Sequence, residues 1–437
     1  MKFRFGISAF LIVVIVTQFC GTCSAYSVLT HEEIIDIVWL SDIQPLLLER
    51  YPASTPAELK EAHAYAYGGS VIQDLGYYPF GSREFSNLLH YVRSGVFVQS
   101  LLQNSQNVND YAFALGALAH YVSDTEGHPA VNSAVAIEYP KLAKKFKTHS
   151  LTYFQDRSAH LETEFGFDMT QVAKGRYNDQ NYHDFIGFKV AKPLLERTFQ
   201  QVYGIPLKDV LEHEDLTIGS YRRSVSKFLP ALTKAALLDR KDEVTHEIPD
   251  FAKKKFLYNL SRADYVREWG NNFQRPGVGA RILAFFLRLV PKIGPFRALA
   301  FKSPTPKTED LYFRSVDHTV TIYRRALHEL ADRQFTLPNR DFDTGKLSTA
   351  GEYELADESY GNLLKRLSKE KFVGVTPPIK TDILAFYGGP SAAASNEPKR
   401  QKKRTQRELQ ELSQFQPNSA NSPSGAEAAA STAHSEN

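Results

Sequence analysis

Apolar residues recur at helical spacing along most of the chain. Thr30 and Glu33 have the spacing of a capping box, and Ile34, Ile35 and Val38 continue the helical pattern behind them. Few stretches alternate with period two, so strands should be rare. The pattern predicts an all-α fold built as a multi-helix bundle. Further helical patterns cover residues 56–75, 83–104, 108–126, 158–174, 183–203, 220–237, 306–333 and 356–369.

Proline and glycine separate these patterns. Gly127 and Pro129 follow the pattern over 108–126 and predict that the helix ends there. Because a residue before proline is biased away from helical geometry, His128 should turn away from this helix.

Both ends of the chain differ from its body. The first 25 residues have a basic start, an apolar run through Val16 and a small-x-small end at Ala25, which is the pattern of a secretory signal peptide. Cleavage after Ala25 would give a secreted or periplasmic protein. An uncleaved membrane anchor is the alternative, although the apolar run is short for a span.

From Ser391 the chain is rich in Ala, Ser, Gln and Pro, which predicts a disordered tail over 391–437. Its basic run at 399–404 is either solvated or attracted to phosphates or an anionic membrane.

Composition limits the binding partners and the metal ligands that the chain can offer. The chain has 437 residues with 43% hydrophobic content, which is typical of a globular protein. Without Lys2 and Arg4 of the leader, 50 basic residues face 49 acidic ones, so the net charge of +1 indicates no strongly basic nucleic-acid binder. Both cysteines, Cys20 and Cys23, lie in the leader. The mature chain therefore has no disulfide, and a zinc site in it must use His, Asp and Glu.

Two histidine–carboxylate pairs have the spacing of metal chelators. Four residues along a helix advance about 6 Å and turn about 40° past a full turn, so His120 and Asp124 share one face, as do His160 and Glu164. One such pair alone is more typical of an exposed polar stripe. The repeat of the pattern, with Asp74 and His90 in apolar surroundings where an unpaired polar group is costly, favours a metal site.

Cleavage after Ala25 would add another chelating group. The free α-amino group and carbonyl of Tyr26 can hold a metal ion, with His31 five residues later completing the site.

Taken in order, these residues resemble the trinuclear zinc phosphodiesterases, which are the bacterial zinc-dependent phospholipases C and the related zinc single-strand nucleases. The resemblance covers about residues 26–200 and implies an all-α fold with zinc held between helices. It also implies up to three zinc ions, with Asp74 as the general base or water-orienting group. The implied ligands are Asp74, His90, His120 and Asp124 for one zinc; His128, His160 and Glu164 for a second; and Tyr26 with His31 for a third, which Asp124 bridges to the first.

The chain departs from this family at two points. Tyr26 stands where tryptophan is usual, and the interval from Asp124 to His128 is shorter than in the toxin and nuclease branches. The expected organisation is a signal peptide over 1–25, a zinc-dependent phospholipase C-like catalytic domain over 26–204, a helical C-terminal extension over 205–390 and the tail. Of the other polar residues, Glu126 is expected to be solvated and His63 to lie at the surface or behind a ligand.

The expected function is that of an exported zinc hydrolase of phosphodiesters. Closely spaced zinc ions clamp a phosphate and lower the pKa of bound water. The near-neutral mature chain favours a phospholipase C acting on phospholipid at a membrane surface over a single-strand nuclease. Residues 278–301 are apolar with interspersed basic side chains, and form either an interfacial element or a buried helical hairpin. A non-catalytic, zinc-stabilised envelope protein is the third possibility. The sequence does not indicate an oligomeric state.

Overall fold

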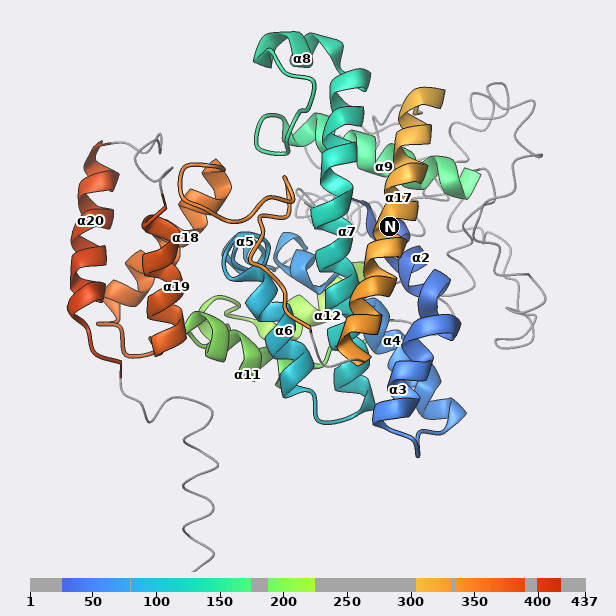
Figure 1. The fold of residues 1–437 in the computed structure, drawn as a ribbon, viewed down its shortest axis with the longest axis horizontal. Helices are drawn as coiled ribbons and strands as arrows, with labels where there is room; N and C mark the ends of the chain where they lie inside the picture. Colours follow the sequence, from blue (N-terminus) through green and yellow to red (C-terminus); the bar gives the residue numbers. More distant parts are fainter. Residues whose placement is uncertain are drawn as a thin grey trace, which may run out of the picture.

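A single long helix, α7 (Val108–Glu138), runs through the centre of the molecule (Figure 1). The structure, a computed structural model, describes residues 26–78, 80–173, 188–224, 304–331, 335–389 and 399–417. Within these residues the regular structure is helical, and the only β pairing is an isolated bridge between Arg340 and Leu347. The predicted all-α fold is confirmed. The other elements are α2 (Val28–Val38), the π-helix η1 (Trp39–Ile43), α3 (Gln44–Arg50), α4 (Pro56–Ser70), the 3-10 helix η2 (Ile72–Tyr77), α5 (Arg83–Tyr91), α6 (Ser94–Asn104), α8 (Pro140–Phe146), α9 (Arg157–Ala173), α11 (Lys192–Tyr203), the 3-10 helix η3 (Leu207–Asp209), α12 (Glu214–Arg223), α17 (Pro306–Ala331), α18 (Glu354–Lys369), α19 (Pro377–Tyr387) and α20 (Lys399–Gln414).

Helix α4 approaches α7 closely because glycines lie at the contact. A Cβ atom at Gly69 would lie 2.0 Å from the Phe113 carbonyl oxygen, and one at Gly116 would lie 2.0 Å from that of Ala66. Helix α17 packs along another side of α7, where the Tyr323 hydroxyl donates a hydrogen bond to the Leu115 carbonyl at 2.9 Å. Segments more than two hundred residues apart therefore share one core around α7.

Helix α7 does not end at Gly127, as the sequence predicted, but continues through Pro129 to Glu138. Proline lacks the N–H that would bond to the carbonyl four residues earlier, which here belongs to Thr125. That carbonyl faces Gly345 of the C-terminal part, where a Cβ atom would lie only 2.1 Å away. His128 consequently stays on the helix, one turn beyond Asp124, and the prediction that it turns away is wrong.

Two other helix boundaries differ from the predicted ones. Helix α2 begins at Val28 with Ser27 as N-cap, and the Thr30 hydroxyl donates to Asp168 Oδ1 at 2.6 Å, so Thr30 forms no capping box. The pattern over 83–104 is divided into α5 and α6 at Arg93, which adopts the left-handed conformation with φ 51°. Helix ends depend on these local backbone conformations and hydrogen bonds, which the spacing of apolar residues does not predict.

Helices α18, α19 and α20 lie at the left of Figure 1. Helix α20 forms where composition predicted a disordered tail: Leu412 is fully buried, and Phe415 contacts Phe372 with 5.6 Å between ring centroids. That prediction is therefore wrong over 399–414.

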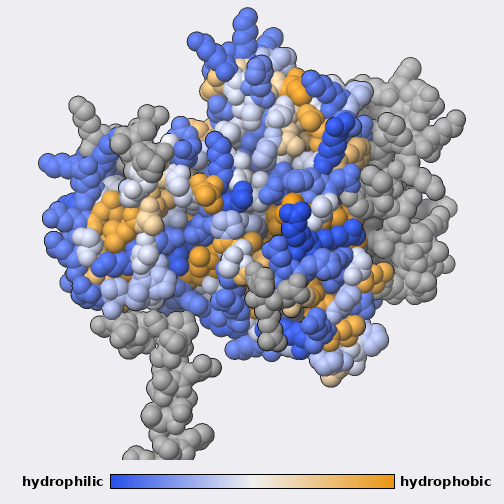
Figure 2. Space-filling view, viewed as in Figure 1, coloured by the Kyte–Doolittle hydropathy of each residue, from blue (hydrophilic) through white to orange (hydrophobic). Residues whose placement is uncertain are grey.

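The leader and residues 278–301 lie outside the described residues. None of the helices that the structure describes has the length and apolar character needed to span a membrane. Figure 2 shows a mostly hydrophilic face with scattered hydrophobic patches.

Candidate metal centre

Four predicted ligands from three elements meet beside the middle of α7. Element η2 carries Asp74, α5 carries His90, and α7 carries His120 and Asp124. Asp74 Oδ1 lies 3.3 Å from His90 Nε2, and Asp124 Oδ2 lies 3.3 Å from His120 Nε2 and 3.6 Å from His90 Nε2. All four side chains are buried. The ligand atoms of Asp74, His90 and His120 lie within 4.8 Å of one another, and Asp124 joins His120 in a second such set, which includes His31.

Backbone carbonyls fix how two of these rings are oriented. Nδ1 of His90 donates to the Ser86 carbonyl at 2.8 Å, and Nδ1 of His120 donates to the Ser70 carbonyl at 2.8 Å. A neutral imidazole that donates through Nδ1 presents its lone pair at Nε2. Within the part of the chain that the structure describes, no hydrogen bond of good geometry reaches either Nε2 atom or Asp74 Oδ1. Such carbonyl partners are typical of metal-binding histidines.

His31 of α2 approaches the same cluster from the other side of Asp124. Its Nε2 lies 3.6 Å from Asp124 Oδ1, and its ring stacks on that of His120 with 4.5 Å between centroids. One oxygen of Asp124 thus faces His31, and the other faces His90 and His120. Tyr26 is buried nearby, with its hydroxyl bonded to Ser315 Oγ and its ring against Gly127. The arrangement suits a carboxylate that bridges two ions.

The third group joins α7 to α9. His160 Nδ1 and Glu164 Oε1 are 2.6 Å apart, and His160 Nε2 donates to Asn132 Oδ1 at 2.7 Å. The His128 ring lies 5.4 Å from that of His160, between centroids. Because His128 remains on α7, the short interval after Asp124 still brings it to this group.

Burial and neighbouring charges shift the pKa values of several of these ligands. Burial, with the Asp124, Asp74 and Asp343 carboxylates, raises the pKa of Glu164 well above its usual value, and burial together with His128 lowers the pKa of His160 well below its own. In the metal-free protein a protonated Glu164 can therefore donate to Nδ1 of a neutral His160. Burial would lower the pKa of His120, but Asp124 and Asp74 raise it to about 9. Protons thus hold positions that a cation would otherwise occupy.

The donor set fits zinc. Three sets of buried ligand atoms each lie within 4.8 Å of one another: His31 with His120 and Asp124, Asp74 with His90 and His120, and His128 with His160 and Glu164. They contain only imidazole nitrogen and carboxylate oxygen, which are the donors zinc accepts in the absence of cysteine. The structure therefore brings together all eight side-chain ligands predicted from the sequence, with Tyr26 beside them.

Two further residues reach this centre that the sequence pattern did not single out. Asn132 holds His160, and Asp343 Oδ1 lies 3.8 Å from His128 Nε2. Asn132 lies one turn beyond His128 on α7, so continuing the helix through Pro129 would have found it. Asp343 had no such signal, since it lies on a turn more than two hundred residues away.

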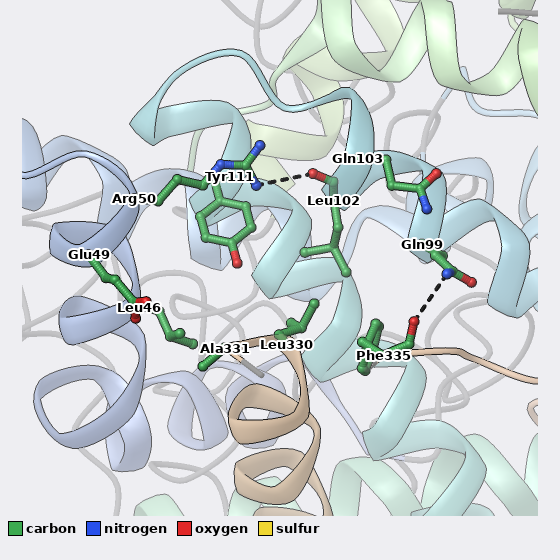
Figure 3. Close-up of a pocket in the computed structure, with 10 residues that line it drawn as sticks. All are labelled: Leu46, Glu49, Arg50, Gln99, Leu102, Gln103, Tyr111, Leu330, Ala331 and Phe335. Carbon is green, nitrogen blue, oxygen red and sulfur yellow. Dashed lines mark hydrogen bonds between the residues drawn. The ribbon is translucent and has the colours of Figure 1, made fainter. Parts of the chain in front are cut away.

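The remaining polar candidates are placed as follows. His63 is not at the surface: it is buried, stacks on Trp39 and bonds to Asp36 at 3.0 Å. Glu126 is partly exposed and pairs with His318 at 3.2 Å. A pocket of about 450 Å³ between α3, α6, α7 and α17 has Arg50 over the Tyr111 ring (Figure 3), and none of its lining residues is a predicted ligand.

Comparison with known proteins adds an independent observation. Residues 30–212 match the family model of zinc dependent phospholipase C. No curated protein and no solved structure matches the chain. The matched segment contains all eight side chains of the three groups, beginning with His31, which is its second residue. Asp343 lies far beyond its end.

Proposed function

We propose, from the match of residues 30–212 to the family model of zinc dependent phospholipase C, that this protein is an exported phospholipase C that binds up to three zinc ions. It would cleave phospholipids to diacylglycerol and a phosphorylated headgroup. The observation that carries the proposal is the convergence of three buried His/Asp/Glu groups on α7, with Asp124 between two of them.

Each ion has its own proposed ligands. Asp74, His90, His120 and Asp124 would hold one ion, and His128, His160 and Glu164 a second. His31 and Asp124 would hold the third, together with the amine and carbonyl of Tyr26 once the leader is removed after Ala25. Bound zinc supplies positive charge for a phosphate and acidifies coordinated water.

The side chains of this chain would then orient the reacting water. Asp74 is the proposed general base or water-orienting group, because one of its oxygens faces His90 and burial raises its pKa from the usual value. A base of raised pKa is better matched to proton transfer near neutral pH. The carbonyls of Ser70 and Ser86 keep His120 and His90 fixed while the proton moves.

Phospholipid is favoured over nucleic acid because the mature chain is nearly neutral, with a net charge of +1. Nonspecific nucleases depend on basic side chains that neutralise many phosphates. A single-strand nuclease remains the alternative activity, and a zinc-stabilised envelope protein the alternative without activity.

The test is metal analysis of the purified chain, coupled to assays on phosphatidylcholine vesicles and on single-stranded DNA. We expect more than two zinc ions per chain and release of diacylglycerol. The Asp74→Asn variant should lose turnover, whereas Asp209→Asn, on the exposed η3 turn, should keep it. DNA cleavage alone would transfer the proposal to a nuclease, and zinc binding without either activity would favour the envelope protein. Absence of zinc would overturn all three.

Export is tested separately by sequencing the N-terminus of protein recovered from its natural compartment. A start at Tyr26 is expected. Any other start would remove the Tyr26 amine from the proposed third site.

A further inference from the structure

A short hairpin from outside the matched family segment packs against the helices that carry the ligands. Residues 339–348 fold back through the Arg340–Leu347 bridge. The Phe342 N–H donates to the His90 carbonyl at 3.2 Å, and the Asn132 side chain donates to the Asp343 carbonyl at 2.8 Å. The hairpin backbone is therefore bonded directly to α5 and α7 beside their metal ligands.

The Asp343 side chain points from this hairpin toward the His128–His160–Glu164 group. It is fully buried, and Oδ1 lies 3.8 Å from His128 Nε2. The other oxygen, Oδ2, accepts hydrogen bonds from the Tyr91 hydroxyl at 3.0 Å and from the Tyr353 hydroxyl. The two tyrosines thus turn one oxygen away from His128 and leave the second directed at it.

This spacing is close to that of two ligands on one ion. With metal–ligand bonds of about 2.0–2.1 Å, two ligand atoms of a tetrahedral zinc lie about 3.3 Å apart. The observed 3.8 Å between Asp343 Oδ1 and His128 Nε2 is longer than this by about half an ångström. A divalent ion at this position would be attracted to the anionic carboxylate as well as to the imidazole nitrogen.

We propose that Asp343 is a further ligand of the metal ion held by His128, His160 and Glu164. The inference rests on the metal centre of the proposed function. It adds that the chain beyond the family segment supplies part of that centre. With Asp343 this ion would have four protein ligands in place of three, and it would be held more firmly than by His128, His160 and Glu164 alone.

Cobalt substitution tests ligation directly. Thiolate bound to Co²⁺ gives a charge-transfer absorption in the near ultraviolet that nitrogen and oxygen ligands do not give. We expect this band in the cobalt-loaded full-length D343C variant and not in the wild type. The matched control is D341C, because Asp341 lies in the same hairpin but accepts its hydrogen bonds from Thr344. A D343C protein that binds cobalt without the band, or an equal band in D341C, would overturn the proposal.

Zinc affinity gives a second readout with an isosteric change. Asp343→Asn keeps an acceptor for the tyrosine hydroxyls but removes the anionic ligand, so the affinity for one of the bound zinc ions should fall at least about tenfold in chelator competition. Asp341→Asn should keep the wild-type affinity. Equal losses in both variants would show that the conformation of the hairpin is responsible and would contradict ligation. A wild-type chain that binds no zinc would instead defeat the proposed function.

Discussion

Asp124 occupies the position in the centre that is hardest to replace. Its two oxygens face different histidines, His31 at 3.6 Å and His120 at 3.3 Å, so one carboxylate serves two of the three ligand groups. Burial would raise its pKa, but His120, His128 and His31 keep it lowered. The group is therefore ionised wherever these rings carry charge, and a cation near it would have the same effect.

Replacing Asp124 should cost more metal than replacing a ligand that serves one ion. Asp124→Asn keeps the shape but weakens both oxygens as ligands, so we expect about two zinc equivalents to be lost per chain. Asp74→Asn, which changes a ligand of a single group, should lose about one. Plasma emission analysis of dialysed protein measures the difference. Full zinc content in Asp124→Asn would show that the carboxylate does not bridge.

Asn132 should act through His160 and not as a ligand. Its Oδ1 accepts from His160 Nε2 at 2.7 Å and so keeps Nδ1 directed at Glu164. Residues that orient a metal-binding histidine typically change metal affinity by about 10- to 100-fold. We expect Asn132→Ala to lower zinc affinity within this range, as measured by chelator competition. Ser133→Ala, which removes an exposed hydroxyl on the same helix, is the control and should have no effect.

Residue patterns located most of this centre. His120 with Asp124 and His160 with Glu164 were visible as i,i+4 pairs, because helix geometry alone places such residues on one face. Asp74 and His90 were visible as polar residues in apolar surroundings, and His31 as a partner for the Tyr26 amine, but their assignment to particular ions came only from the family that the chain resembles. Asp343 was not visible either way, since its position depends on how the C-terminal part packs against α5 and α7.

At the scale of elements, Pro129 and Gly345 affect the same backbone carbonyl, that of Thr125 in α7. Proline leaves the Thr125 carbonyl without its usual helical donor, and Gly345 is where the hairpin comes closest to that carbonyl. Gly345 also has φ +70°, a conformation that other residues adopt at a cost. The apolar period predicted the existence of α7 but not its continuation through proline, and the hairpin that packs against this part of the helix lies more than two hundred residues away in the sequence.

Gly345→Ala should therefore displace the hairpin. A Cβ atom would lie 2.1 Å from the Thr125 oxygen, and the left-handed conformation adds about 1–2 kcal/mol, so we expect the free energy of unfolding to fall by at least about 2 kcal/mol. Gly219→Ala is the control, since nothing lies within 4 Å of a Cβ atom there and alanine favours the helix by about 0.5–1 kcal/mol. Urea unfolding followed by circular dichroism compares the two variants. A Gly345→Ala protein as stable as Gly219→Ala would contradict the close contact.

At the scale of the whole molecule, the family segment and the C-terminal part are built around one core. Tyr323 of α17 bonds to α7, Tyr312 bonds to Thr30 beside His31, and Ser315 bonds to Tyr26. The predicted boundary at residue 204 followed the extent of the resemblance, which is a property of sequence and not of packing. We propose that residues 306–387 fold together with the catalytic segment and support α2 and α7.

Metal removal should therefore destabilise the entire molecule, increasingly so at higher pH. In the metal-free protein the pKa of Glu164 is raised by burial, and that of His120 is raised to about 9 by its carboxylates. Because the folded-state pKa of His120 lies above its unfolded value, its contribution to stability falls as pH rises from 6.5 toward 8.5, whereas the lowered pKa values of His31 and His160 act in the opposite direction, mainly below about pH 7, where unfolded histidine binds a proton. His120 alone would account for about 2 kcal/mol over this range. Metal binding, in contrast, strengthens as its ligands lose protons.

The two trends act in opposite directions on the melting temperature. We expect chelation to lower it at every pH from 6.5 to 8.5, and the gap between zinc-loaded and metal-free protein to widen as pH rises. Differential scanning calorimetry of both forms measures the gap, with zinc added back as the control for reversibility. A gap that stays constant or narrows would mean that the buried carboxylates and histidines do not exchange protons for metal ions. The three ligand groups around α7 would then be a hydrogen-bonded core and not a metal centre.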